Sequence, residues 1–100
     1  MLLDEIEKDK DNILDIFDRY GASNVRIMGS VSKREETELS DIDFVVTLYK
    51  LPDGKSDLVR YMGLLKDLES YFKRNIDLAD EEQICTMYRK ALSEAYHLER

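Results

Sequence analysis

The stretch that decides the fold is Ser40-Asp41-Ile42-Asp43-Phe44-Val45-Val46, which begins ten residues after the Ser of a Gly29-Ser30 pair. Side chains alternate between the two faces of a strand, so Asp41 and Asp43 are expected to project from the same face. Adjacent carboxylates repel each other, and a divalent cation between them would relieve that repulsion. The Gly-Ser turn leads into a helix start, whose backbone N–H groups can bind a phosphate. Metal and phosphate together indicate chemistry on a nucleotide.

Outward from this stretch, the pattern of apolar residues predicts the other elements. Residues 41–48 are apolar on both faces beyond the aspartates and are expected to form a central strand. The order of elements predicts the α+β class, with a small mixed sheet of three to four strands and helices packed against it. The expected elements are a helix from about Leu2 to Tyr20 that stops at Gly21, a strand Asn24–Met28, a helical turn near Ser30, a helix from Ser56 to about Phe72, a strand Asn75–Ala79 and a last helix that begins at Asp80.

Two of these helices carry more detailed expectations. Ser56 is the expected N-cap of one, and Asp80 is the expected N-cap of the other, with Gln83 at the capping-box position. The residues expected to face inward from the first are Leu58, Tyr61, Met62, Leu65, Leu68 and Phe72. The expected stripe on the last helix consists of Ile84, Met87, Tyr88, Ala91, Ala95 and Leu98. An exposed part of that stripe would favour a homo- or hetero-oligomer.

Composition limits the classes of function. One hundred residues suit one domain, expected over 1–100, and a net charge of −7 argues against binding to a nucleic acid backbone. A lone cysteine, Cys85, excludes an internal disulfide, and no apolar run is long enough to span a membrane. The acidic N-terminus does not resemble a secretory signal. We therefore expect a cytoplasmic protein. The sole histidine, His97, is interpreted as a solvated side chain and Cys85 as structural.

A third carboxylate lies in the strand expected at 75–79. Asp77 alternates with Ile76 and Leu78, which turns it away from an apolar face. If this strand lies beside the one that carries Asp41 and Asp43, the three carboxylates converge and suit one or two Mg²⁺ ions. The alternative is ordinary turn chemistry at Asp41 and Asp43 and a solvent-facing Asp77.

The Gly29-Ser30 turn has two interpretations as well. Its backbone and the Ser30 hydroxyl could hold terminal phosphates, with Lys33 or Arg34 adding positive charge. An isolated Gly-Ser pair is more often an ordinary turn between a strand and a loop.

The whole pattern is more specific than its parts. Gly29-Ser30, a charged spacer and Ser40-Asp41-Ile42-Asp43-Phe44, bracketed by two strands, resembles the signature of the DNA polymerase β-like nucleotidyltransferase superfamily. In length and element order the chain looks most like the minimal nucleotidyltransferase (MNT) group, and the resemblance covers nearly all of it.

The resemblance implies roles for particular residues. Asp41, Asp43 and Asp77 match the three catalytic, metal-binding carboxylates, of which the third supports the second Mg²⁺ and helps to activate the attacking hydroxyl. The implied nucleotide-binding residues are Gly29, Ser30, Lys33, Arg34 and Ser40. In such enzymes an acceptor oxygen attacks the α-phosphate of a Mg²⁺-bound nucleoside triphosphate, and pyrophosphate leaves.

The sequence departs from the family after the Gly-Ser pair. The family usually has Ala-Arg-Gly where this chain has Ser32, Lys33 and Arg34. Lys33 keeps the charge but not the forked guanidinium of arginine. Arg34 either restricts the loop or supplies the guanidinium one position later.

Members of the minimal group are similar to antitoxins encoded beside HEPN-domain toxins. The resemblance therefore implies transfer of AMP from ATP to a tyrosine of a HEPN toxin. Two alternatives stay open: a non-catalytic antitoxin or binding module of the same fold, and a small-molecule (antibiotic) nucleotidyltransferase. The latter is disfavoured because the chain has no second domain to form an acceptor pocket.

Overall fold

A computed structural model of the protein describes residues 2–37, 40–54, 57–83 and 89–100. Its strands are β1 (Ser23–Met28), β2 (Ile42–Thr47), β3 (Ile76–Asp80) and β4 (Tyr96–His97), and they form one sheet in the order β3-β2-β1-β4. β2 is antiparallel to β1 and parallel to β3, and β4 is antiparallel to β1. The predicted α+β class and the central place of the Asp43 strand are confirmed.

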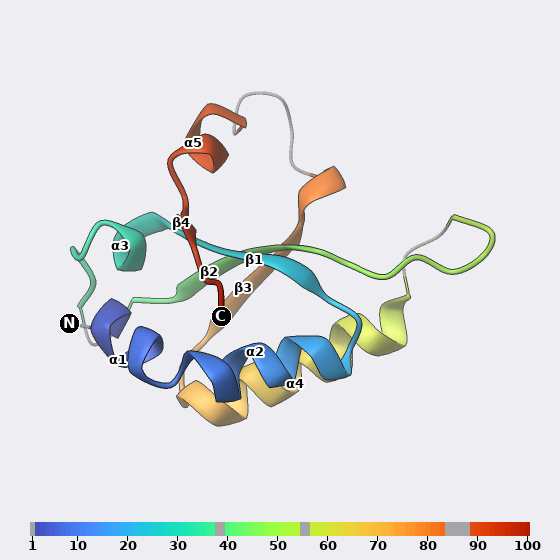
Figure 1. Cartoon of the computed structure of the whole chain (residues 1–100), viewed down its shortest axis with the longest axis horizontal. Coiled ribbons are helices and arrows are strands. Elements are labelled where there is room, and N and C mark those ends of the chain that lie inside the picture. Colours follow the sequence, from blue (N-terminus) through green and yellow to red (C-terminus); the bar gives the residue numbers. More distant parts are fainter. Residues whose placement is uncertain (1, 38–39, 55–56, 84–88) are drawn as a thin grey trace.

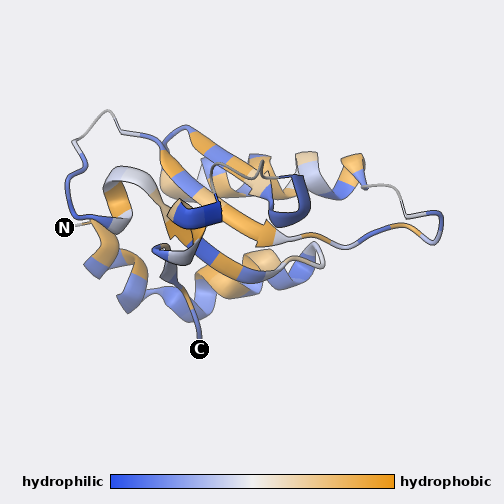
Figure 2. Ribbon diagram, turned by 90° about the horizontal axis from the view of Figure 1, so that it is seen from above, coloured by the Kyte–Doolittle hydropathy of each residue, from blue (hydrophilic) through white to orange (hydrophobic). Residues whose placement is uncertain are grey.

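Helices cover one face of this sheet more fully than the other. α1 (Leu2–Lys8), α2 (Lys10–Arg19) and α4 (Leu58–Phe72) pack on one face, while α5 (Arg89–Ser93) lies on the opposite side (Figure 1). The short α3 (Gly29–Ser32) directly follows β1. The strands are largely hydrophobic, and apolar residues recur along the helices beside them (Figure 2). At the centre of the core, the Phe44 ring lies 5.2 Å from that of Phe17 and 5.9 Å from that of Phe72, between ring centroids.

Strand alternation sorts the sheet residues between these two faces. The face toward α1, α2 and α4 carries the apolar core residues, and the opposite face, termed the open face below, carries both polar and apolar ones. On the core face lie Ile27, Ile42, Phe44, Val46, Ile76 and Leu78, and on the open face lie Arg26, Met28, Asp43, Val45, Asp77 and Ala79.

The first helix is broken where a single helix was predicted. α1 ends at Lys8 and α2 begins at Lys10, with Asp9 between them at φ −109° and ψ 18°. The Asp9 carboxylate accepts a hydrogen bond from the Asn12 side chain at 2.7 Å, and such local bonds compete with helix continuation. The predicted stop is confirmed, since Gly21 has a φ of +71°. No helix in the described part of the chain is long and apolar enough to span a membrane.

The helix α4 begins one residue later than expected and buries fewer of its apolar side chains. Asp57 is its N-cap and accepts a hydrogen bond from the Arg60 N–H at 3.1 Å, whereas Ser56 lies outside the described residues. The inward placement of Leu58 and Met62 is wrong, because these side chains are 70% and 53% exposed. Leu68 faces the core as expected, together with Leu64; Tyr61, Leu65 and Phe72 are partly buried against it.

The long last helix is also wrong. Asp80 ends β3, where its carboxylate accepts a hydrogen bond from the Glu82 N–H at 3.2 Å and pairs with Lys50. A 3₁₀ turn (Glu81–Gln83), the five-residue α5 and β4 replace the helix in the described segments. Its predicted stripe residues Ile84, Met87 and Tyr88, and also Cys85, lie outside those segments. Of the rest, Leu98 is buried in the core beyond β4, Ala91 is exposed and Ala95 half-buried. His97 is exposed on β4.

Candidate active site

Two of the three predicted carboxylates are neighbours across the sheet. Asp43 in β2 and Asp77 in β3 are register partners in the parallel pair, so both side chains project from the open face. Asp41 lies immediately before β2 and is exposed. The structure therefore places Asp77 on the same side as Asp43, as the sequence alternation predicted.

The charges of these residues act on one another. Partial burial raises the pKa of the Asp43 carboxyl above its ordinary value, and the negative charges of Asp77 and Asp41 raise it further. An ionised Asp43 is thus held in an environment that disfavours its charge. A cation at this position would stabilise that charged form.

Gly29 is required beside this carboxylate for two reasons. Its φ is +71°, a conformation that residues with a side chain rarely adopt. A Cβ atom at Gly29 would also lie only 2.3 Å from Oδ2 of Asp43. The backbone at the start of α3 therefore approaches the Asp43 carboxylate as closely as only glycine permits. This contact brings the Gly-Ser turn and Asp43, which are distant in the motif, into one site.

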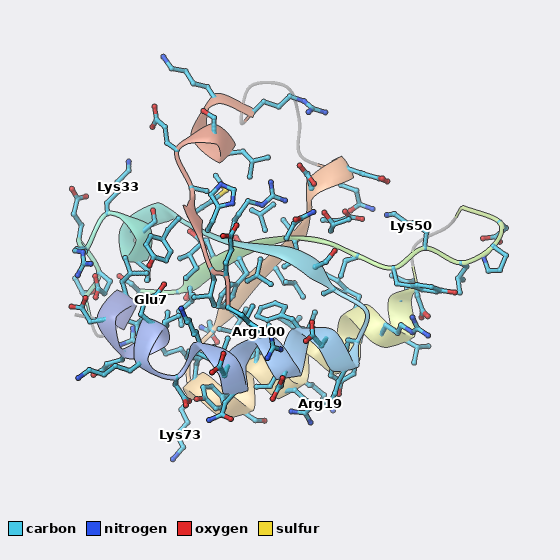
Figure 3. All side chains as sticks on the ribbon, in the orientation of Figure 1. Glu7, Arg19, Lys33, Lys50, Lys73 and Arg100 are labelled. Carbon is cyan, nitrogen blue, oxygen red and sulfur yellow. The ribbon has the colours of Figure 1, made fainter. Side chains whose placement is uncertain are left out.

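A cleft of about 460 Å³ opens between α3, the open face of the sheet and α5. Its polar lining comes from the two aspartates and from Ser32, Lys33 and Glu94, and Figure 3 shows Lys33 extending from the end of α3. The remaining wall is apolar or small. The residues that complete it are Met28, Gly29, Phe44, Val45, Ala79, Ala91 and Ala95. One side of the cleft is thus acidic, and the Lys33 side chain contributes a positive charge to its lining.

The other predicted nucleotide-binding residues lie around the cleft rather than on its walls. Ser30 is half-buried within α3. The Arg34 guanidinium is engaged by Asp4 of α1 at 2.7 Å. The Ser40 hydroxyl accepts a hydrogen bond from the Thr37 N–H at 2.9 Å. Arg34 and Ser40 thus make contacts within the segment that joins α3 to β2.

The donor set of Asp43 and Asp77 fits a hard divalent cation that takes other ligands from outside the protein. Across residues 2–37, 40–54, 57–83 and 89–100, no three His, Cys, Asp or Glu side chains are arranged to hold a metal ion. Mg²⁺ commonly binds through only one or two protein carboxylates and takes its other ligands from water and substrate phosphates. Asp43 and Asp77 supply such a pair beside a cleft of sufficient size for a nucleotide's phosphates. They are therefore suited to a site that is completed by substrate.

Sequence reasoning missed part of the cleft. Ala91, Glu94 and Ala95 line it from α5 and the turn after it, a region assigned to a continuous helix from local periodicity. No sequence signal marks them as wall residues. Ser32, in contrast, stands within the Gly-Ser motif and could have been chosen; its hydroxyl donates to the Gly29 carbonyl at 2.8 Å.

Comparison with known proteins agrees with this geometry. The family model of the nucleotidyltransferase domain matches residues 10–98. No protein of curated function matches the sequence. A solved structure described as a minimal nucleotidyltransferase is 29% identical, with a TM-score of 0.77, and the match covers 93% of this chain and 92% of that one.

Two further solved structures are toxin–antitoxin complexes that share the fold. One, a toxin–antitoxin with AMP-PNP, is 20% identical with a TM-score of 0.73, over 91% of this chain and 73% of that one. The other is a tri-AMPylated HEPN toxin of Shewanella oneidensis in complex with an MNT antitoxin. It is 19% identical with a TM-score of 0.64, over 91% and 69% of the two chains. Because the family model spans most of the sequence and the fold and cleft agree with it, the chain belongs to the nucleotidyltransferase domain family.

Proposed function

We propose that the protein is a Mg²⁺-dependent adenylyltransferase that moves AMP from ATP to a tyrosine hydroxyl of a HEPN toxin. Through this modification it acts as the toxin's antitoxin. The observation that carries the proposal is the pairing of Asp43 with Asp77 under the Gly29 backbone, at one end of a cleft. The toxin–antitoxin structures that share the fold, one with AMP-PNP and one with an AMPylated HEPN toxin, support the choice of nucleotide and partner.

Each part of the cleft has a place in this reaction. The N–H groups in the first turn of α3 and the Lys33 ammonium would bind the triphosphate, because both favour negative charge. Asp41, Asp43 and Asp77 would hold one or two Mg²⁺ ions. When bound, such ions screen and polarise the phosphoryl oxygens.

The remaining step is nucleophilic attack. Asp77, exposed beside Asp43, would accept the proton of the acceptor hydroxyl. The hydroxyl oxygen would then form a bond to the α-phosphorus of ATP, while the bond from that phosphorus to the bridging oxygen breaks and pyrophosphate leaves. A partner protein would carry the acceptor.

The test is AMP transfer from labelled ATP to a co-purified HEPN protein, followed by mass spectrometry of the modified tyrosine. Asp43→Asn and Asp77→Asn should each lower the rate by about 100-fold or more, since several kcal/mol of charge stabilisation are lost. Asp11→Asn, an equal change of charge at an exposed position on α2, should leave the rate unchanged.

The same variants distinguish the binding-module alternative. If Asp43→Asn neutralises the toxin as well as the wild type does, the protein acts by occupying its partner and the catalytic proposal fails. If neutralisation and AMP transfer are lost together while the variant stays folded, the proposal holds.

A further inference from the structure

Arg74 fixes the backbone just before Asp41, one of the predicted metal-binding residues. It lies in the link between α4 and β3, and its Nη1 atom donates hydrogen bonds to the carbonyl oxygens of Thr37 and Ser40, each at 3.1 Å. The Ser40 carbonyl belongs to the peptide group that joins Ser40 to Asp41. One guanidinium nitrogen therefore fixes the orientation of the peptide group that precedes Asp41.

A second bond holds the chain on the other side of Asp41. The Ile42 N–H donates to the Asn75 carbonyl at 3.2 Å. Asp41 itself precedes β2, so it lies outside the strand that aligns Asp43 with Asp77. The backbone on both sides of Asp41 is thus tied to Arg74 and Asn75, the two residues that lead directly into β3.

Arg74 lies outside the cleft. Arg74 lines a separate cavity between α1, α2 and the C-terminal end of α4, together with Leu2, Ile6 and Tyr71. It is not among the residues that line the cleft. Its position suits a residue that acts through the Asp41 backbone and not one that touches a nucleotide in the cleft.

We propose that Arg74 is a positioning residue that sets Asp41 relative to Asp77, and so controls how tightly the site binds its divalent cation. This inference rests on the function proposed above. Groups that orient metal ligands from outside the coordination shell contribute about 10- to 100-fold to metal affinity or activity. The position of Asp43 relative to Asp77 is set by strand pairing and does not depend on the hydrogen bonds of Arg74.

The test compares four proteins: wild type, Arg74→Met, Arg74→Lys and Lys66→Met. Met keeps the length of the side chain but donates no hydrogen bond, whereas Lys places several donors on one nitrogen, as Nη1 does. Lys66→Met removes a cation from an exposed position on α4 and is the matched control. Each protein is assayed for AMP transfer over a range of Mg²⁺ concentrations, and for Mn²⁺ binding by electron paramagnetic resonance with AMP-PNP present.

Arg74→Met should raise the Mg²⁺ concentration for half-maximal transfer, and the Mn²⁺ dissociation constant, by about tenfold. The KM for ATP at saturating Mg²⁺ should change by less than about threefold, and Arg74→Lys should recover most of the loss. Lys66→Met should match the wild type. A purely structural role would lower the melting temperature of Arg74→Met without moving its metal requirement.

The outcomes separate this inference from the proposed function. If the wild type transfers AMP and Arg74→Met needs no more Mg²⁺, the inference is wrong and the function stands. If the wild type transfers no AMP but binds Mn²⁺ more tightly than Arg74→Met does, the inference holds and the function fails. If the wild type neither transfers AMP nor binds Mn²⁺, both fail.

Discussion

Replacement of Gly29 by alanine should separate the site's geometry from the stability of the fold. The left-handed φ of +71° costs a residue with a Cβ about 1–2 kcal/mol. For a chain of this length, that loss lowers the melting temperature by roughly 5–15 °C. The new Cβ would lie 2.3 Å from Oδ2 of Asp43, where ordinary contact begins at 3.4 Å, so the carboxylate must retreat by about 1 Å. A displacement of this size at a reacting centre costs about 100-fold in rate.

Gly54→Ala is the matched control. Gly54 also has a left-handed φ, +83°, but among the described residues no heavy atom lies within 4 Å of the added Cβ. Because the Asp43 carboxylate can rotate away, the two variants should lose similar stability in thermal or urea unfolding. Only Gly29→Ala should lose AMP transfer and Mg²⁺ affinity. The reasoning is refuted if Gly29→Ala retains activity within about threefold of Gly54→Ala, once both are compared as folded protein.

Three other changes test separate parts of the structure. The raised pKa of Asp43 means that the folded state holds this proton more tightly than the unfolded state, so metal-free stability should fall as pH rises from the ordinary aspartate value through the raised one. Asp43→Asn should therefore raise the melting temperature at neutral pH without Mg²⁺. If the melting temperatures of wild type and Asp43→Asn depend on pH in the same way, this expectation is wrong. Glu81→Gln should cost roughly 1–2 kcal/mol in urea unfolding, because Glu81 accepts a hydrogen bond at 3.1 Å from Arg26, whose side chain is only 8% exposed. Glu82→Gln, at a 68% exposed side chain, should cost much less, and equal losses would rule out the role of burial. Lys73→Gly should stabilise the protein by about 0.5–1 kcal/mol with unchanged AMP transfer, since Lys73 ends α4 at a φ of +53°; a loss of stability would show that this cap carries no strain.

The strands and their acidic side chains could be predicted from sequence because both depend on a period of two. Asp43 stands between Ile42 and Phe44, and Asp77 stands between Ile76 and Leu78. Any arrangement that buries those apolar neighbours turns the carboxylates to the other face. Once the strands pair in parallel, the two carboxylates must share that face, as the observed register confirms.

The last quarter of the chain could not be predicted in the same way, because the deciding interaction is distant in sequence. The pattern near the C-terminus has helical spacing, but β1 has an edge that pairs with Tyr96 and His97. The Leu98 N–H then donates to the Val25 carbonyl at 2.9 Å. Satisfying the edge of β1 outweighs the local helical preference. The helical spacing of apolar residues near the C-terminus carries no information about a strand edge that lies about seventy residues earlier in the chain.

Helical spacing failed differently in α4. It placed Leu68 in the core and Tyr61, Leu65 and Phe72 beside it, but it missed Leu64 and wrongly placed Leu58 and Met62 inside. Leu64 and Leu68 are fully buried, whereas Leu58 and Met62, nearer the start of the helix, are exposed. Burial depends on which turns of a helix lie over the sheet, and the periodicity of α4 carries no information about this.

The departure from the family motif after Gly29-Ser30 is resolved by backbone conformation. Arg34 stands where the family usually has Gly, and its φ is +58°, so the loop keeps the conformation that a glycine would adopt. Its guanidinium is paired with Asp4 at 2.7 Å and is not among the residues that line the cleft. In the proposed function, Lys33, which lines the cleft, would supply the positive charge as a compact ammonium without the bidentate geometry of arginine. Under the function proposed above, this arrangement would preserve the shape of the turn while changing how strongly and how specifically a phosphate is held. Substrate preference in this protein should therefore depend more on Lys33 and the acidic pair than on Arg34.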